Sequence, residues 1–350
     1  MAEAATLLEP RESAWNDVCA LGLQRHVADL DANGFCVIPP EIANPNNLAG
    51  RMLEALLDIA ERRNGERPDV VTGATHAYQP NMRFGAKNER YGRGQVDKEI
   101  PEISSPHPDA VDSPFGDRMH SIFFEDEVFA EALMNPPMIA LVTYLLGYSA
   151  VLSAMGCWMK GPCRSNFPLH TDSGGIPEPL PAQSYAAQCT YVLTDFNREN
   201  GATCIVPGSH KWNRNPEGEE TVLLPYEQGG SEQALACEAP AGSLIIWQGN
   251  TWHGAFNRTA PGIRVSVTVY FYRPFMRPLE DFIDKIPERK LEELIDKYGQ
   301  RIAIVLQQGC VPGFSTQGDR VSGTARAEQF VSAYRAESGV GVGRKSDAYG

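Results

Sequence analysis

The sequence lacks the features that mark a membrane protein or a nucleic-acid-binding protein. It has no long block of lysines and arginines, and 31 basic side chains are outnumbered by 44 acidic ones, for a formal net charge of −13. Binding to phosphate backbones needs a clustered basic surface, which this charge balance does not offer. No apolar run approaches the roughly 20 residues that cross a bilayer, and the N-terminus has no cationic segment followed by an apolar one. We therefore expect a cytoplasmic protein that binds a small molecule, with no nucleic-acid or membrane partner.

Cysteine pairs are also lacking. The eight cysteines are dispersed and none forms a C-x-x-C motif. In a cytoplasmic protein such thiols are expected to be buried in apolar segments rather than in disulfides or structural zinc sites.

Helical periodicity dominates residues 10–148, which we interpret as a helical flank. Apolar residues recur at helical spacing up to Asn33-Gly34, from 45 to 63 and from 127 to 146, where Pro136 is expected to begin a new helix. Phe35 to Pro39 interrupts this pattern as one short buried strand. Residues 64–120 show little periodicity, as in a functional lid or a disordered loop.

From residue 150 to 275 the pattern becomes that of short strands. β-Branched and aromatic runs alternate with Gly, Pro and Asn clusters, which favours an antiparallel sandwich or barrel. One more helix is expected at 279–300. We predict a mainly β, α+β chain with flanking helices, organised as one domain over residues 1–325 and followed by a flexible tail at 326–350. The sequence leaves open whether the chain forms a homodimer.

A metal-binding pair is suggested by His170-Thr171-Asp172. Residues two apart in an extended segment point to the same face, so the imidazole and the carboxylate converge. A lone H-x-D motif has little specificity. A second histidine, His253, ends a buried strand, and residues 257–262 are expected to form a hairpin turn to the next strand.

That next strand carries a candidate anion site. Arg264, Ser266 and Thr268 lie on one face, with valines at the alternating positions. An arginine fork followed by a hydroxyl suits a carboxylate ligand; an Arg paired with a protein carboxylate or pointing to solvent is the alternative. Two histidines and one carboxylate are the ligand set of non-haem Fe(II) oxygenases, and a dicarboxylic 2-oxo acid could chelate iron while its distal carboxylate reaches Arg264.

Four segments in order resemble the phytanoyl-CoA dioxygenase family of Fe(II)/2-oxoglutarate-dependent oxygenases. They are His170-Thr171-Asp172, the run from Glu199 to His210 (ENGATCIVPGSH), Trp252-His253-Gly254, and Arg264 eleven residues after His253. The resemblance covers about residues 22–275.

The resemblance implies a double-stranded β-helix, a cupin-like jelly-roll, in which His170, Asp172 and His253 ligate Fe(II). Arg264 and Ser266 would bind 2-oxoglutarate, and O2 would be the second cosubstrate. The family oxidises C–H bonds, usually by hydroxylation, and releases succinate and CO2. Asp172 argues against halogenation, because related halogenases have Gly or Ala there. His210 is expected to be structural.

Two positions depart from the family pattern. Thr190 stands where many members have Trp, and it could hydrogen-bond the cosubstrate. Ala255 stands where a serine is common, which leaves Ser266 to supply the hydroxyl.

The sequence defines the substrate less closely than it defines the metal site. An apolar pocket is predicted from five side chains, although aromatic residues on such strands are often plain core: Trp158, Met155, Phe167, Tyr191 and Trp252. Arg83, in a basic cluster with Lys87, Arg90 and Arg93, is predicted to meet an anionic substrate group; a solvated loop is the alternative.

Three functions therefore compete. An oxygenase of secondary metabolism acting on a small organic metabolite comes first, with an acyl-CoA hydroxylase as its variant, because an acyl-CoA would need such a basic patch. A metal-binding jelly-roll module without turnover is the second. A cupin-type metalloenzyme without cosubstrate is the third, and the Arg264 and Ser266 pair argues against it.

Overall fold

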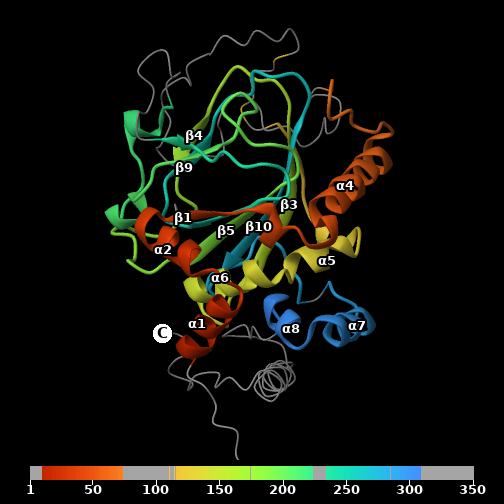
Figure 1. Cartoon of the computed structure of the whole chain (residues 1–350), viewed down its shortest axis with the longest axis vertical. Helices are drawn as coiled ribbons and strands as arrows, with labels where there is room; N and C mark the ends of the chain where they lie inside the picture. Colours follow the sequence, from red (N-terminus) through yellow and green to blue (C-terminus); the bar gives the residue numbers. More distant parts are fainter. Residues whose placement is uncertain are drawn as a thin grey trace, which may run out of the picture.

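Two antiparallel β-sheets face each other, and helices cover the outer face of the larger sheet (Figure 1). The computed structural model describes residues 10–73, 110, 114, 116–173, 175–223, 234–283 and 285–308. One large apolar core fills the space between the helices and the larger sheet, and a smaller one lies between the two sheets. This arrangement confirms the predicted mainly β jelly-roll with flanking helices.

The larger sheet has the order β1-β8-β5-β10-β3-β2 and the smaller one the order β4-β9-β6-β7. The strands of the larger sheet are β1 (Phe35–Ile38), β2 (Asp117–Met119), β3 (Val151–Lys160), β5 (Ala186–Val192), β8 (Leu244–Gln248) and β10 (Arg264–Tyr272). Those of the smaller sheet are β4 (Phe167–His170), β6 (Thr203–Ile205), β7 (Leu235–Ala236) and β9 (His253–Ala255).

The helices begin and end where the sequence carries helix-breaking residues. Gly34, at φ 85°, caps one helix in the left-handed conformation, and Pro136 opens another, as predicted. In the described ranges no helix is long and apolar enough to cross a membrane. The α-helices are α1 (Pro10–Ala20), α2 (Gln24–Asn33), α3 (Pro40–Ala43), α4 (Leu48–Asn64), α5 (Val128–Leu133), α6 (Pro136–Leu146), α7 (Glu288–Tyr298) and α8 (Arg301–Val305), with short 3-10 turns at Pro45–Asn47, Ile122–Phe124, Ser209–Trp212 and Gly218–Thr221.

Strand β10 is two-faced, as its alternating sequence predicts. Val265, Val267 and Val269 pack into the core beneath the helices. Arg264 and Ser266 are buried on the opposite face, which looks toward the smaller sheet. The period of two therefore places polar side chains between the sheets.

The predicted hairpin from His253 to Arg264 is wrong. Strand β9 pairs with β4 and β6 in the smaller sheet, whereas β10 pairs with β3 and β5 in the larger one. The connection between β9 and β10 crosses from one sheet to the other. Side-chain hydrogen bonds stabilise it where a hairpin would have backbone hydrogen bonds: Asn166 accepts from the Asn257 N–H, and the Arg258 guanidinium donates to the Gly262 carbonyl.

Two other boundaries differ from the sequence prediction. The expected helix at 279–300 is shorter, because it begins only after Pro287, and a proline disfavours helical geometry in the residue before it. The segment predicted as a helical flank contributes β1, which was expected, and β2, which was not, to the edges of the larger sheet. The 326–350 tail lies outside the described residues, as does most of the 64–120 segment.

Candidate metal centre

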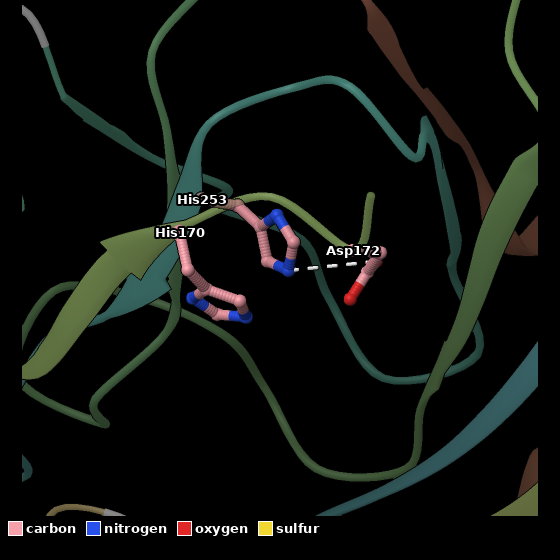
Figure 2. Close-up of side chains that lie close together, drawn as sticks. All are labelled: His170, Asp172 and His253. Atoms are coloured by element: carbon pink, nitrogen blue, oxygen red, sulfur yellow. Dashed lines mark ion pairs between the residues drawn. The ribbon is translucent and has the colours of Figure 1, made fainter. Parts of the chain in front are cut away.

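The two histidines face each other across the smaller sheet. His170 is the last residue of β4 and His253 the first of β9, and the two are direct partners in the antiparallel register. Their ring centroids lie 4.2 Å apart (Figure 2). Direct cross-strand partners project to the same face, so both imidazoles point into the space between the sheets.

Asp172 reaches the same point from the turn after β4. Its backbone N–H donates to the Gly249 carbonyl at 2.9 Å, which ties this turn to the end of β8. Its Oδ2 lies 3.6 Å from Nε2 of His253, and one ligand atom from each of the three residues lies within 4.8 Å of the others (Figure 2). Oδ2 is buried and has no hydrogen-bond donor. The three groups are spaced to ligate one metal ion.

The second nitrogen of each imidazole is already engaged. Nδ1 of His170 lies 3.0 Å from the Pro168 carbonyl, and Nδ1 of His253 lies 2.9 Å from the Thr251 carbonyl. A carbonyl accepts only, so Nδ1 carries the proton and Nε2 keeps its lone pair. Backbone carbonyls fix metal-ligating histidines in this tautomer in many proteins.

The protonation states at neutral pH also suit a cation. Burial lowers the pKa of both histidines to about 4, and in His170 the neighbouring His253 acts in the same direction. Burial raises the pKa of Asp172 to about 6, against the opposing effect of His170. At pH 7 the imidazoles are neutral and the carboxyl is mainly ionised, which is the state that metal binding requires.

Two glycines allow the backbones to approach this closely. A Cβ on Gly254 would lie 3.0 Å from the Pro168 carbonyl oxygen and closer still to that of Phe167. A Cβ on Gly249 would lie 2.7 Å from that of Ala186. Glycine is therefore required where β9 passes the irregular register of β4 and where β8 ends beside Asp172.

Arg264 lies on the facing sheet. It is buried, its Nη1 donates to the Gly201 carbonyl, and its Nε has no partner. The guanidinium stacks over the ring of Phe196 at 4.5 Å. Within the part of the chain that the structure describes, no carboxylate pairs with it, so its counter-charge has to come from a ligand.

The hydroxyl groups predicted beside Arg264 share its face of the larger sheet. Ser266 is two residues along β10, and Thr190 of β5 is paired with Thr268. Both are buried, and Oγ1 of Thr190 has no hydrogen-bond partner. The sheet thus offers an arginine and hydroxyls on the side that faces the histidines.

Two of the predicted pocket residues lie beside this site. The ring of Phe167 is 4.7 Å from that of His170. Trp158 of β3 is the cross-strand partner of Ser266 of β10 and lies on the same face of the sheet. The guanidinium of Arg118 stacks over the Trp158 ring, 4.6 Å from its centroid.

Three other predicted pocket residues are placed elsewhere, so their assignment is wrong. Met155 and Tyr191 belong to the core beneath the helices, where the Tyr191 hydroxyl donates to the Ala132 carbonyl at 2.7 Å. Trp252 points away from His253, its neighbour in the chain, and its Nε1 donates to the Arg214 carbonyl. Arg83 lies outside the described residues.

Some residues near the site were not foreseen. The ring of Trp247 lies 5.0 Å from that of His253, and Lys160 lies directly opposite Arg264 across the strands. Only the register of the larger sheet reveals them, because both occur in apolar runs with no motif. His210, predicted to be structural, lies apart from the three ligands and contacts the Asp31 carbonyl at 3.3 Å.

Comparison with known proteins gives the family. The phytanoyl-CoA dioxygenase family model matches residues 30–266, which include all three candidate ligands and Arg264. The chain belongs to the phytanoyl-CoA dioxygenase family. The resemblance seen in the sequence is thereby confirmed.

Curated relatives of this phytanoyl-CoA dioxygenase family member are distant. The dioxygenase af480 of Aspergillus fumigatus is 29% identical over 186 residues, 51% of this chain and 56% of that protein. The dioxygenase FUM3 of Gibberella moniliformis is 31% identical over 124 residues, 34% of this chain and 38% of that one. The chain thus matches about half or less of the length of these relatives.

Similarity to solved structures is lower. HygX of Streptomyces hygroscopicus, with nickel, 2-oxoglutarate and hygromycin B bound, is 16% identical with a TM-score of 0.48, over 73% of this chain and 89% of that chain. The carbocyclase SnoK from nogalamycin biosynthesis is 17% identical with a TM-score of 0.46, over 71% of this chain and 83% of the SnoK chain.

Proposed function

We propose that this protein is an Fe(II)- and 2-oxoglutarate-dependent dioxygenase that oxidises a C–H bond of a small organic metabolite, most simply by hydroxylation. One observation carries the proposal: two neutral imidazoles and a carboxylate converge on one point, and an unpaired buried arginine faces them from the opposite sheet. The facial arrangement of two histidines and one carboxylate suits non-haem iron. Family membership and the naming of the relatives af480 and FUM3 as dioxygenases support the same class.

Each residue has one task in this proposal. His170, Asp172 and His253 hold the iron through Nε2 and carboxylate atoms. Arg264 binds the distal carboxylate of 2-oxoglutarate, with Ser266 and Thr190 as hydroxyl partners. Iron bound there would supply, with 2-oxoglutarate and O2, the oxidising power of this class of reaction, whose coproducts are succinate and CO2.

The described residues beside the site support a small metabolite as the substrate. Phe167 and Trp158 offer aromatic surface beside the ligands, and this kind of lining suits an organic substrate held largely by apolar contact. The basic cluster that an acyl-CoA would need lies outside the described residues, so the acyl-CoA variant stays a prediction, as do the cytoplasmic location and a homodimer.

Turnover separates the oxygenase from a metal-binding module. We expect purified protein with Fe(II), ascorbate and O2 to convert 2-oxoglutarate to succinate, slowly without substrate and faster with it. The variant His253→Ala should not form succinate above the background of free iron. Equal succinate yields from wild type and H253A would contradict the proposal, and tight cosubstrate binding without any turnover would favour the module.

A further inference from the structure

Two buried cations lie side by side on the face of the larger sheet that looks toward the candidate metal ligands. Lys160 of β3 and Arg264 of β10 are direct partners in the antiparallel register, and both are more than nine-tenths buried. Like charges placed directly opposite one another on neighbouring strands destabilise a sheet. Burial of cations adds a further cost unless a counter-charge is present.

No side chain in the described part of the chain supplies that counter-charge. The ammonium of Lys160 donates to the Phe256 carbonyl at 2.6 Å, and an ammonium has three donors to offer. The Arg264 guanidinium is bonded to the Gly201 carbonyl and leaves its Nε without a partner. Neither side chain forms an ion pair among the residues that the structure describes.

A third buried cation nearby shows what a purely structural role looks like. The Arg258 guanidinium donates to the carbonyls of Gly262, Pro261 and Asn200 and so closes the loop between β9 and β10. Its donors are engaged by these carbonyls and by the side-chain oxygen of Asn200. Lys160 and Arg264 instead have N–H groups that lack an acceptor, on the face that looks toward the smaller sheet.

We propose that Lys160 is a second cation of the cosubstrate site, which holds the distal carboxylate of the 2-oxo acid together with Arg264 and thereby selects dicarboxylates. This inference rests on the proposed function. Arg264 offers a planar fork and Lys160 a point charge, so one carboxylate can accept from both. The smaller sheet presents Ala255 and its cross-strand partner Thr203 on the face of His253, and the larger sheet supplies both cations.

The charges around Lys160 support this role. Burial lowers the pKa of Lys160 to about 8; Arg264 and Arg198 act in the same direction and the thiols Cys163 and Cys204 in the opposite one. A bound carboxylate would raise this pKa again. The pKa of Arg264 is lowered to about 10, and burial raises that of Cys204 to about 12, so both stay protonated at pH 8.5.

The test compares two ligands that differ only at the distal end. Calorimetric titration of the Co(II)-loaded protein with 2-oxoglutarate and with 2-oxopentanoate, in which a methyl group replaces the carboxylate, gives the preference for the dicarboxylate. We expect Lys160→Met to reduce that preference by roughly 10- to 100-fold, since a hydrogen bond to a charged group contributes that much. Lys160→Arg should retain most of it. The control Arg258→Gln removes a nearby buried cation that is bonded to the backbone and acts on Arg264 through its charge, so it should change the preference much less than Lys160→Met does.

Equal weakening of both ligands by K160M would mean a structural role for Lys160 and would overturn the inference. Wild-type protein that binds neither ligand would instead overturn the proposed function, and the inference with it.

A second measurement needs no variant. At pH 8.5, binding of 2-oxoglutarate to wild type should take up as much as roughly 0.8 proton more than binding of 2-oxopentanoate, because Lys160 becomes protonated on binding. Titrations in buffers of different ionisation enthalpy measure this uptake. Equal proton uptake for the two ligands would contradict the assignment of Lys160.

Discussion

In the proposed metal centre, the protonation of Asp172 should set the pH range of metal binding. Burial raises its pKa to about 6, so its folded-state carboxyl takes up a proton about two pH units above its ordinary value of 3.8. A metal needs the carboxylate form and competes with that proton. The histidines, with pKa values near 4, stay neutral and available through this range.

The affinity for a divalent metal should therefore be level above pH 7 and fall by about tenfold for each pH unit below pH 6. Titration with Co(II) between pH 5 and 7.5 measures this. Asp172→Asn should bind at least roughly 100-fold more weakly at pH 7. An affinity that does not change between pH 7 and pH 5 would remove Asp172 from the ligand set.

The residues that the structure brings together in the proposed site were predictable from the sequence where a motif and a strand face coincide. The H-x-D pair, His253 and the alternation of Arg264 with valines each carry a local signal. Lys160 and Trp247 carry no such signal, because their positions beside the site depend on which strands become neighbours. No short segment of sequence determines which distant strands pair or in which register.

Strand register also decides which neighbours in sequence serve the site. Thr190 and Tyr191 are adjacent in β5 but lie on opposite faces, and a shift of one residue would exchange them. The sequence prediction chose pocket residues by aromatic type and so included Tyr191, Met155 and Trp252. Their faces follow from pairing with β10 and β4, which residue type does not encode.

This difference between neighbours predicts opposite effects of two small changes. Thr190→Val removes the unpartnered hydroxyl on the site face and should weaken 2-oxoglutarate binding by roughly tenfold with little change in stability. Tyr191→Phe removes the bond to the Ala132 carbonyl and should lower the free energy of unfolding by about 1 kcal/mol while cosubstrate affinity is kept. The reverse pattern in calorimetry and urea unfolding would mean that β5 is assigned the wrong faces.

Strand β9 packs so closely against β4 that adding one methyl group at Gly254 should destabilise the fold. Gly254→Ala should push the Phe167 and Pro168 carbonyls away, displace His170 and destabilise the fold by about 1–3 kcal/mol. The affinity for metal should also fall, because His170 is displaced. Gly175→Ala is the matched control, because nothing lies within 4 Å of a Cβ there. Equal behaviour of the two variants would show that the strands do not need this close approach.

At the scale of the whole molecule, the proposed ligands connect the two sheets. The metal ligands belong to the smaller sheet or the turn beside it, and the cosubstrate residues to the larger sheet. None of the described helices carries one of these proposed ligands, and they support the larger sheet from behind through the main apolar core. The sheet order that creates this bridge follows from chain-long pairing, so the sequence predicted the fold class but placed the β9–β10 connection wrongly.

Ligands that bind only the folded state should therefore stabilise the molecule in two separable steps. Metal at 100 times its Kd should add about 2.7 kcal/mol, and 2-oxoglutarate at 100 times its Kd a similar increment. Arg264→Met should lose the second increment and keep the first, since only the distal carboxylate loses its partner. Thermal unfolding with metal, with cosubstrate and with both measures this; an R264M variant still stabilised by 2-oxoglutarate would contradict the role of Arg264.

The central claim is that His170, Asp172 and His253 hold iron to which 2-oxoglutarate binds. Anaerobic titration of the protein with Fe(II) and then 2-oxoglutarate tests it most directly, through the weak visible charge-transfer band of the chelate. We predict that the band appears with wild type, saturates at one equivalent of iron per chain and is absent from His170→Ala. No band with wild type, or an unchanged band in H170A, would contradict the account.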